Sequence, residues 1–192
     1  MRARLRIRQS MAAALRSVRA GVALGLAALA ACAPSLNWRT VQVPQAWLEV
    51  PLPCRAQSAV RTVQWDGHAV ELSVTGCAVR GVLFAVSHAE LDDPSRIGPT
   101  LEQWQRSVRE HVDAPVQEQA RPFVPPLALD VPASRRLRLQ GHRSDGSPVA
   151  VEVVWFARLQ PPQVRLYQVM VYGPQVAPAV ADTLFAGITL LP

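Results

Sequence analysis

The sequence predicts an α+β fold, in which a mainly antiparallel sheet carries two helices packed on one face. Three observations lead to this fold class. Several segments alternate apolar and polar residues with a period of two, which is typical of half-buried strands. Two pairs of these segments are joined by tight turns that contain Asp-Gly, as in antiparallel hairpins. Only two stretches, near residues 97–112 and 178–187, have helical features, so strands outnumber helices.

A leader precedes the predicted domain. Its first part contains six arginines and no acidic residue, and residues 22–31 form an apolar run. About 20 apolar residues are needed to span a bilayer, whereas this shorter run has the length of a signal-peptide core. Translation from Met1 or from Met11 would preserve the pattern. Residues 1–31 are therefore predicted to be a signal peptide.

The end of this leader, Leu29-Ala30-Ala31-Cys32, resembles the lipobox of bacterial lipoproteins, in which small residues separate a leucine from an essential cysteine. The resemblance implies that the chain is cut before Cys32 and that Cys32 is acylated on its thiol and its new amino group. Two or more acyl chains give stable membrane anchoring. Ordinary cleavage, with Cys32 as a bystander, is the alternative. Ala33 is not the aspartate that retains lipoproteins in the inner membrane, which favours the outer membrane.

The predicted mature chain is neutral. All 20 basic residues are arginine, and the six in the leader leave 14 against 14 acidic residues. Nucleic-acid binding needs a clustered basic surface, so this function is not predicted. Arg135, Arg136 and Arg138 form the one local basic run. In a strand Arg136 and Arg138 share a face, which we interpret as a solvated outer face, with an anion site as the alternative.

The cysteines are consistent with an oxidising compartment. If Cys32 is acylated, Cys54 and Cys77 remain and can form a disulfide there. Two buried thiols are the alternative. A metal site needs more ligands at short spacing than stand near these cysteines, so no metal or other cofactor is predicted.

After a lipidated tether at residues 32–37, residues 38–192 are predicted to form a single domain. The fold begins at residues 38–43, and residues 46–52 are predicted to form a strand with Trp47 and Leu48 near the core. Proline cannot donate to a ladder, so this strand is expected to be bulged or at a sheet edge. The prolines concerned are Pro44, Pro51 and Pro53.

The clearest hairpin has a two-residue turn at Asp66-Gly67, which is expected to be of type I′. This turn sets Trp65 opposite His68 and places an apolar face on one side of both strands. Gly76 interrupts the alternation and suggests a bulge. Residues 82–86 are apolar on both faces, so they are predicted to form a central strand with a helix on one side.

A helix is predicted next, because five apolar residues recur at steps of three and four. Thr100 with Gln103 resembles a capping box. Three acidic residues precede the helix, where its dipole favours negative charge, and calcium binding is their alternative role. These acids are Glu90, Asp92 and Asp93, and the apolar stripe is Ile97, Leu101, Trp104, Val108 and Val112.

Residues 114–134 contain many prolines and are predicted to be an irregular surface loop, with at best a short strand around Phe123. Such a stiff loop could line a binding site for a partner.

The second hairpin requires a loop of odd length. A two-residue turn at Asp145-Gly146 would set Leu139 opposite Glu152 and mix the faces. Pairing Leu139 with Val153 keeps the apolar residues together, which needs three or five residues at the tip.

The chain is predicted to end with a central strand over residues 164–172, a helix that begins at Pro178 and ends before Gly187, and a strand over residues 188–191. Val180 and Leu184 of this helix are expected to face inward. The order of the elements resembles the Mog1/PsbP-like fold of small accessory proteins, a likeness that implies an α+β sandwich but no particular activity.

No catalytic pattern stands out. No two of the four histidines lie within five residues of each other, and the chain has no nucleophile elbow, phosphate loop or paired-carboxylate signature. An enzyme is therefore not predicted. The hypothesis is an envelope lipoprotein that faces the periplasm and docks a protein or cell-wall component; a small periplasmic hydrolase is the alternative. The histidines are His68, His88, His111 and His142.

Overall fold

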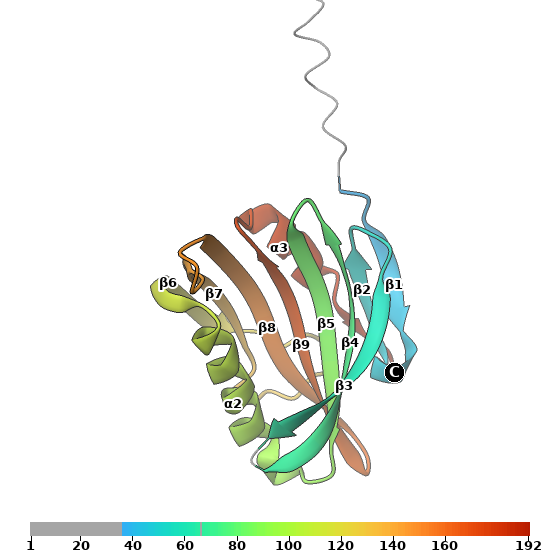
Figure 1. The fold of residues 1–192 in the computed structure, drawn as a ribbon. Coiled ribbons are helices and arrows are strands. Elements are labelled where there is room, and N and C mark those ends of the chain that lie inside the picture. The colour runs from blue at the N-terminus through green and yellow to red at the C-terminus, as the bar shows by residue number, and fades with distance from the viewer. Residues whose placement is uncertain (1–35, 66) are drawn as a thin grey trace, which may run out of the picture. The chain divides into compact units, whose positions relative to one another are not determined.

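The computed structural model describes residues 36–65 and 67–192, of which residues 37–192 form one compact unit. The unit contains a three-stranded sheet of order β1-β2-β10 and a seven-stranded sheet of order β3-β4-β5-β9-β8-β7-β6 (Figure 1). All paired strands are antiparallel. The predicted α+β class with a mainly antiparallel sheet is thus confirmed. The strands are β1 (Arg39–Val43), β2 (Leu48–Leu52), β3 (Gln57–Trp65), β4 (His68–Val79), β5 (Val82–Leu91), β6 (Asp113–Pro122), β7 (Arg135–His142), β8 (Pro148–Gln160), β9 (Gln163–Gly173) and β10 (Thr189–Leu190).

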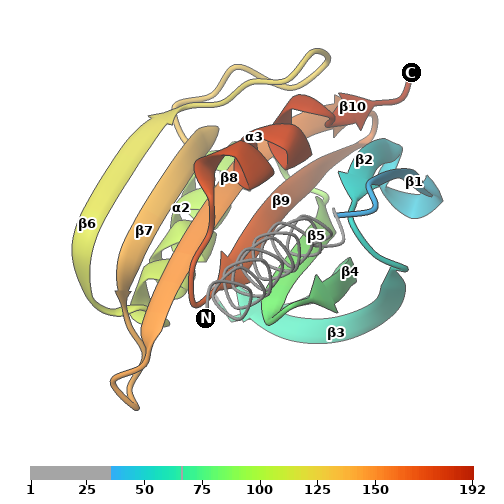
Figure 2. The same ribbon diagram turned by 90° about the horizontal axis from the view of Figure 1, so that it is seen from above.

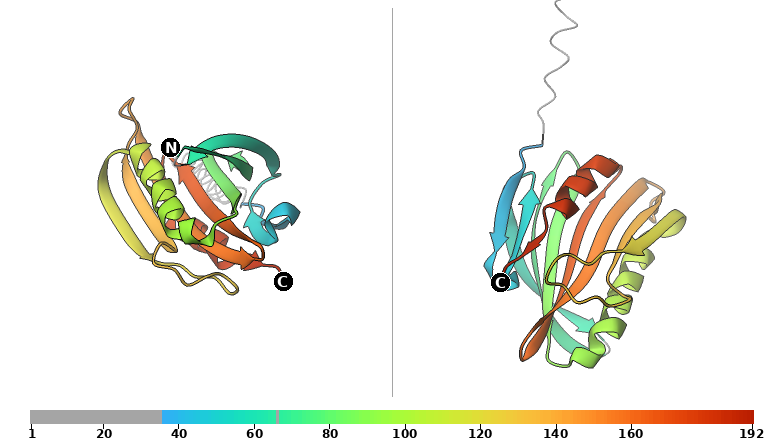
Figure 3. Two further views of the ribbon diagram at one scale, coloured as in Figure 1. Left: turned by 90° about the horizontal axis from the view of Figure 1, so that it is seen from below. Right: turned by 180° about the vertical axis from the view of Figure 1, so that it is seen from behind.

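The two main helices lie on opposite faces of the large sheet, and the prediction that both pack on one face is wrong (Figures 2 and 3). Helix α2 (Ile97–Glu110) packs on one face and helix α3 (Pro178–Ala186) on the other. The cause is the composition of β8 and β9, which are apolar on both faces, so that each face needs a covering layer. Leu101 and Trp104 of α2 pack with Trp155 and Leu166, whereas Leu184 and Phe185 of α3 pack with Phe156 and Tyr167.

The α2 face contains a buried polar contact. Gln168 of β9 is 5% exposed, and the two indole N–H groups beside it assign its amide oxygen to the side facing the rings, where it accepts from Trp104 and Trp155, both at 3.0 Å. One glutamine therefore satisfies two buried donors, one on α2 and one on β8, and fixes the helix against the sheet.

The small sheet helps α3 to cover the other face. Leu48 and Val50 of β2 are fully buried there. Strand β2 lies between β1 and β10 and pairs with β1 without a register shift, so the prediction of an edge strand or a bulged strand is wrong. Strand β10 pairs only with Leu48 and Glu49, however, so Pro51 has no neighbour on that side. Trp47 was expected in the core but is 45% exposed, because it occupies a left-handed bend (φ 49°) before β2.

The first hairpin has the predicted register. Trp65 pairs with His68 and Val63 with Val70. The predicted bulge at Gly76 is absent, since β4 stays in register with β3 and β5 through this residue. A Cβ atom at Gly76 would overlap the carbonyl oxygen of Phe84, so close approach of the neighbouring strand explains this glycine.

The loop of the second hairpin has an odd number of residues, as predicted from the need to keep the apolar residues on one face. His142 pairs with Pro148, which leaves a five-residue loop over residues 143–147, and Gly146 in it has φ 79°. The pairing differs from the expected one by two residues, because Val153 lies opposite Leu137 instead of Leu139. A shift of two keeps every side chain on its predicted face.

The proline-rich stretch was expected to be a loop, yet its first part forms β6, an edge strand of the large sheet. An edge strand tolerates prolines because one side of its backbone needs no ladder partner. The loop proper spans residues 123–134. Helix α2 begins at Ile97, where the predicted apolar stripe begins, but the predicted capping box is absent: Asp93 caps the preceding 3-10 turn (Pro94–Arg96), and Thr100 is fully buried inside the helix.

The remaining elements follow the prediction closely. Strand β5 lies between β4 and β9, and β9 lies between β5 and β8, so both are central. Helix α3 begins at Pro178 and is followed by Gly187. Of the two residues expected to face inward, Leu184 is fully buried and Val180 partly so. No helix in the described ranges is long and apolar enough to cross a bilayer.

Candidate functional site

The predicted cysteine pair forms a disulfide. Cys54 follows β2 and Cys77 lies in β4, and their Cα atoms are 5.9 Å apart. The bond therefore joins the end of the small sheet to the large sheet. The predicted lipidation site, Cys32, lies outside the described residues.

The four histidines do not converge on one point, but two of them line the same hollow. This hollow has a volume of about 500 Å³, and His68 and His88 lie in its wall with several acidic residues. Ser73 of β4 pairs directly opposite His88 of β5. Sequence spacing gave no sign of this arrangement, because it depends on the register of two long strands.

His88 is buried, which together with the nearby Arg165 guanidinium lowers the pKa of its imidazole to about 4. The ring is therefore neutral at pH 7. Arg165 forms an ion pair with Glu90 across β5 and β9. A neutral imidazole can accept a proton, but a group with so low a pKa is a weak general base at neutral pH.

The three acidic residues that precede α2 each interact with a different partner. Glu90 pairs with Arg165, and Asp92 accepts from Gln163 Nε2 at 3.1 Å. Asp93 accepts from the backbone N–H and the hydroxyl of Ser95, at 2.9 and 2.7 Å. Within the part of the chain that the structure describes, no three His, Cys, Asp or Glu side chains are grouped so that they could hold a metal ion.

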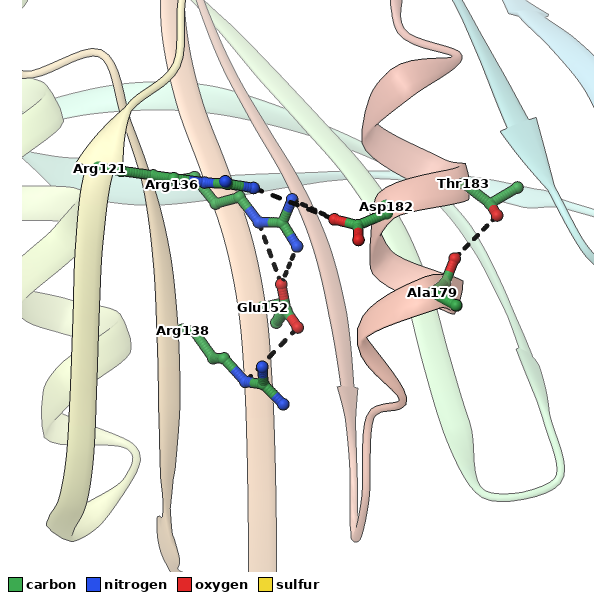
Figure 4. A network of polar contacts seen from close by, with 7 residues as sticks. All are labelled: Arg121, Arg136, Arg138, Glu152, Ala179, Asp182 and Thr183. Carbon is green, nitrogen blue, oxygen red and sulfur yellow. Dashed lines mark hydrogen bonds and ion pairs between the residues drawn. The ribbon is translucent and has the colours of Figure 1, made fainter.

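The basic run on β7 forms a polar network with β8 and α3 (Figure 4). Arg136 and Arg138 share one face, as alternation predicted, but Arg136 is buried, so the expected solvated outer face is wrong for it. Its Nε donates to Glu152 Oε2 at 3.0 Å, and its Nη1 donates to Asp182 Oδ1 at 2.6 Å. Arg138 Nε lies 3.6 Å from Glu152 Oε1.

The electrostatics of this network favour its charged form. Burial lowers the pKa of Arg136, but hydrogen bonds and charge attraction from Glu152 and Asp182 outweigh it, so the pKa is raised. The Arg136 guanidinium also lies over the Phe185 ring, 4.8 Å from its centroid. These contacts tie β7, β8 and α3 together. The signal that could have revealed them is Glu152 in an otherwise apolar strand, since a buried acid needs a cation.

Most charged side chains of the network and of the histidine hollow already have partners. The arginines of the network face two carboxylates, and Glu90, Asp92 and Asp93 near the histidine hollow have cationic or hydrogen-bonding partners. Their contacts hold strands and helices to one another. The chain matches no protein-family model and no curated protein sequence.

Proposed function

We propose that this chain is an envelope lipoprotein, anchored through acylated Cys32, whose unit over residues 37–192 acts as a binding or accessory module at the membrane surface. The observation that carries the proposal is the lipobox at the end of a short apolar run. In this account the module faces the periplasm, and its partner is an envelope protein or a cell-wall component. Ala33 after the cysteine favours the outer membrane.

The Cys54–Cys77 disulfide supports the compartment. Disulfides persist in oxidising environments such as the bacterial periplasm and are rare in the cytosol. The pair also adds a covalent link between two sheets that are otherwise held by side-chain packing and by hydrogen bonds such as that from Tyr167 Oη to the Ala46 carbonyl oxygen, so oxidation after export would further stabilise the fold.

The anchoring is tested with Cys32→Ser in the full chain. Cells are labelled with an alkyne-bearing palmitate analogue, and the envelope is then separated into inner and outer membranes. We expect label and outer-membrane localisation in the parent and loss of both in the variant. Cys54→Ser is the matched control, because it removes a cysteine that the proposal does not acylate, and it should keep the label. Equal labelling of parent and Cys32→Ser would contradict the proposal.

The second candidate, a small periplasmic hydrolase, is favoured by one observation: His68 and His88 line one hollow with Ser73 opposite His88. A panel of ester, amide and glycoside substrates tests it on the purified parent and His88→Asn, with His142→Asn as control. Turnover that is lost only in His88→Asn would favour the hydrolase.

The module makes the opposite prediction. It expects no turnover by any of the three proteins, together with a defined cross-linked partner in intact envelopes when a photo-cross-linker replaces Val124, an exposed residue of the proline-rich loop. Turnover without such a partner would contradict the module.

A further inference from the structure

A groove runs along one flank of α2, on the face of the large sheet that this helix covers. Two hollows, of about 450 and 440 Å³, share Trp104 and Ser107 of α2 and therefore adjoin each other along the helix. Helix α2 has 14 residues, which at 1.5 Å per residue makes it about 21 Å long. Figure 1 shows the helix in front of β7 and β8, with β5 and β9 beside it.

Apolar side chains that the core leaves partly open line this groove. Leu83 of β5 is 39% exposed. Met170 and Tyr172 of β9 and Val108 of α2 are half-buried and belong to the margin of the α2-side core. An apolar ligand in the groove would remove this surface from water, which favours binding roughly in proportion to the area covered.

One cationic side chain, Arg143, lies at the first hollow without a direct ion pair, although the charge of Asp145 in the same loop attracts it. Arg143 Nε donates to Tyr172 Oη at 2.7 Å, and the guanidinium lies over the Tyr172 ring, 5.1 Å from its centroid. Its Nη1 donates to Ser147 Oγ at 3.3 Å. No Asp or Glu lines this hollow, and among the described ion pairs none involves Arg143.

This charge pattern separates the groove from the other hollows. The histidine hollow contains several acids, and in the hollow beside Arg136 three arginines already pair with Glu152 and Asp182. In the first hollow a mainly apolar lining is combined with one guanidinium that has N–H donors to spare, whereas the second hollow is also lined by Arg106 and Glu110. A carboxylate is the group that such a donor set pairs with best.

We propose that this groove binds a single-chain amphiphile with an anionic head, a free long-chain carboxylate. Its alkyl chain lies along α2 over Leu83 and Met170, and its carboxylate pairs with Arg143. His111 and Val112, at the end of α2, line the same hollow as Arg143. The carboxylate must therefore contact the guanidinium directly, to offset the repulsion by the last carbonyl oxygens of the helix. This inference does not depend on acylation of Cys32.

Dodecanoate is the probe, and its binding is measured by titration calorimetry below the concentration at which it forms micelles. The protein is the full chain with Cys32→Ser, so that an attached acyl chain cannot compete. We expect one saturable site per chain. Leu83→Trp and Met170→Trp fill the groove from different strands and should each abolish binding. Melting curves of all variants confirm that they are folded.

Two comparisons test the head group. Arg143→Gln should weaken dodecanoate binding about tenfold, whereas Arg39→Gln, on the small sheet, should leave it unchanged. Dodecyltrimethylammonium, with a similar chain but a positive head, should bind more weakly than dodecanoate. Absence of saturable binding, or unchanged binding in both tryptophan variants, would overturn the site. Equal affinity for the two amphiphiles, or no effect of Arg143→Gln, would overturn the role assigned to Arg143.

Discussion

Removal of the Cys54–Cys77 disulfide should destabilise the domain by an amount that its loop length sets. The two cysteines are 23 residues apart. In the chain-entropy model, closing a loop of that length lowers the entropy of the unfolded chain enough to stabilise the fold by about 3.4 kcal/mol at 25 °C. This is a large share of the 5–15 kcal/mol that separates most folded domains from their unfolded states.

The measurement is urea unfolding of the full chain and of the double variant Cys54→Ser/Cys77→Ser, followed by circular dichroism. We expect the free energy of unfolding to fall by about 3 kcal/mol and the midpoint of thermal unfolding to fall by about 7–14 °C. Cys32→Ser is the matched control and should leave both unchanged. A loss below about 1 kcal/mol, or two free thiols in the oxidised parent, would refute the reasoning.

Three further predictions concern buried polar groups. Glu152→Gln removes the buried one of the two carboxylates that pair with Arg136, leaving only the more exposed Asp182, and should cost about 3–5 kcal/mol in urea unfolding. The exposed Glu102→Gln should cost almost nothing, and equal losses would contradict this. Gln168→Leu removes the acceptor of two buried indole N–H groups and should lower the free energy of unfolding by about 2–6 kcal/mol, with a change in near-ultraviolet circular dichroism; an unchanged midpoint would contradict it. His88 has a pKa lowered to about 4 from 6.5, so its neutral form stabilises the fold above pH 6.5, and this contribution is lost as the pH falls toward 4. His88→Asn should flatten that part of the stability profile, and a profile that stays unchanged would refute the assignment.

Local sequence patterns predicted correctly those features of the fold that depend on a single periodicity or a single turn. The register at Trp65 and His68 followed from the Asp-Gly pair, and the odd loop after His142 followed from the need to keep apolar residues on one face. The borders of α3, from Pro178 to Gly187, followed from the preferences of proline and glycine at helix ends.

The predictions were wrong for features that depend on contacts between segments distant in the sequence. The edge position of β6 let a proline-rich segment pair as a strand, which local propensity argues against. The side of the sheet that each helix covers depends on chain crossings that periodicity does not encode. Arg136 was expected on a solvated face, and it is buried because Glu152 and Asp182, distant in sequence, surround it. The hollow with His68 and His88 likewise depends on strand register.

Membrane anchoring of this protein depends above all on the modification of Cys32. Its most direct test is the intact mass of the protein extracted from membranes, followed by sequencing of its N-terminal peptide. We predict a chain that begins at Cys32 and carries a diacylglyceryl group on the thiol and an acyl group on the amine. A chain that retains residues 1–31, or one that begins at an unmodified Cys32, would contradict the account.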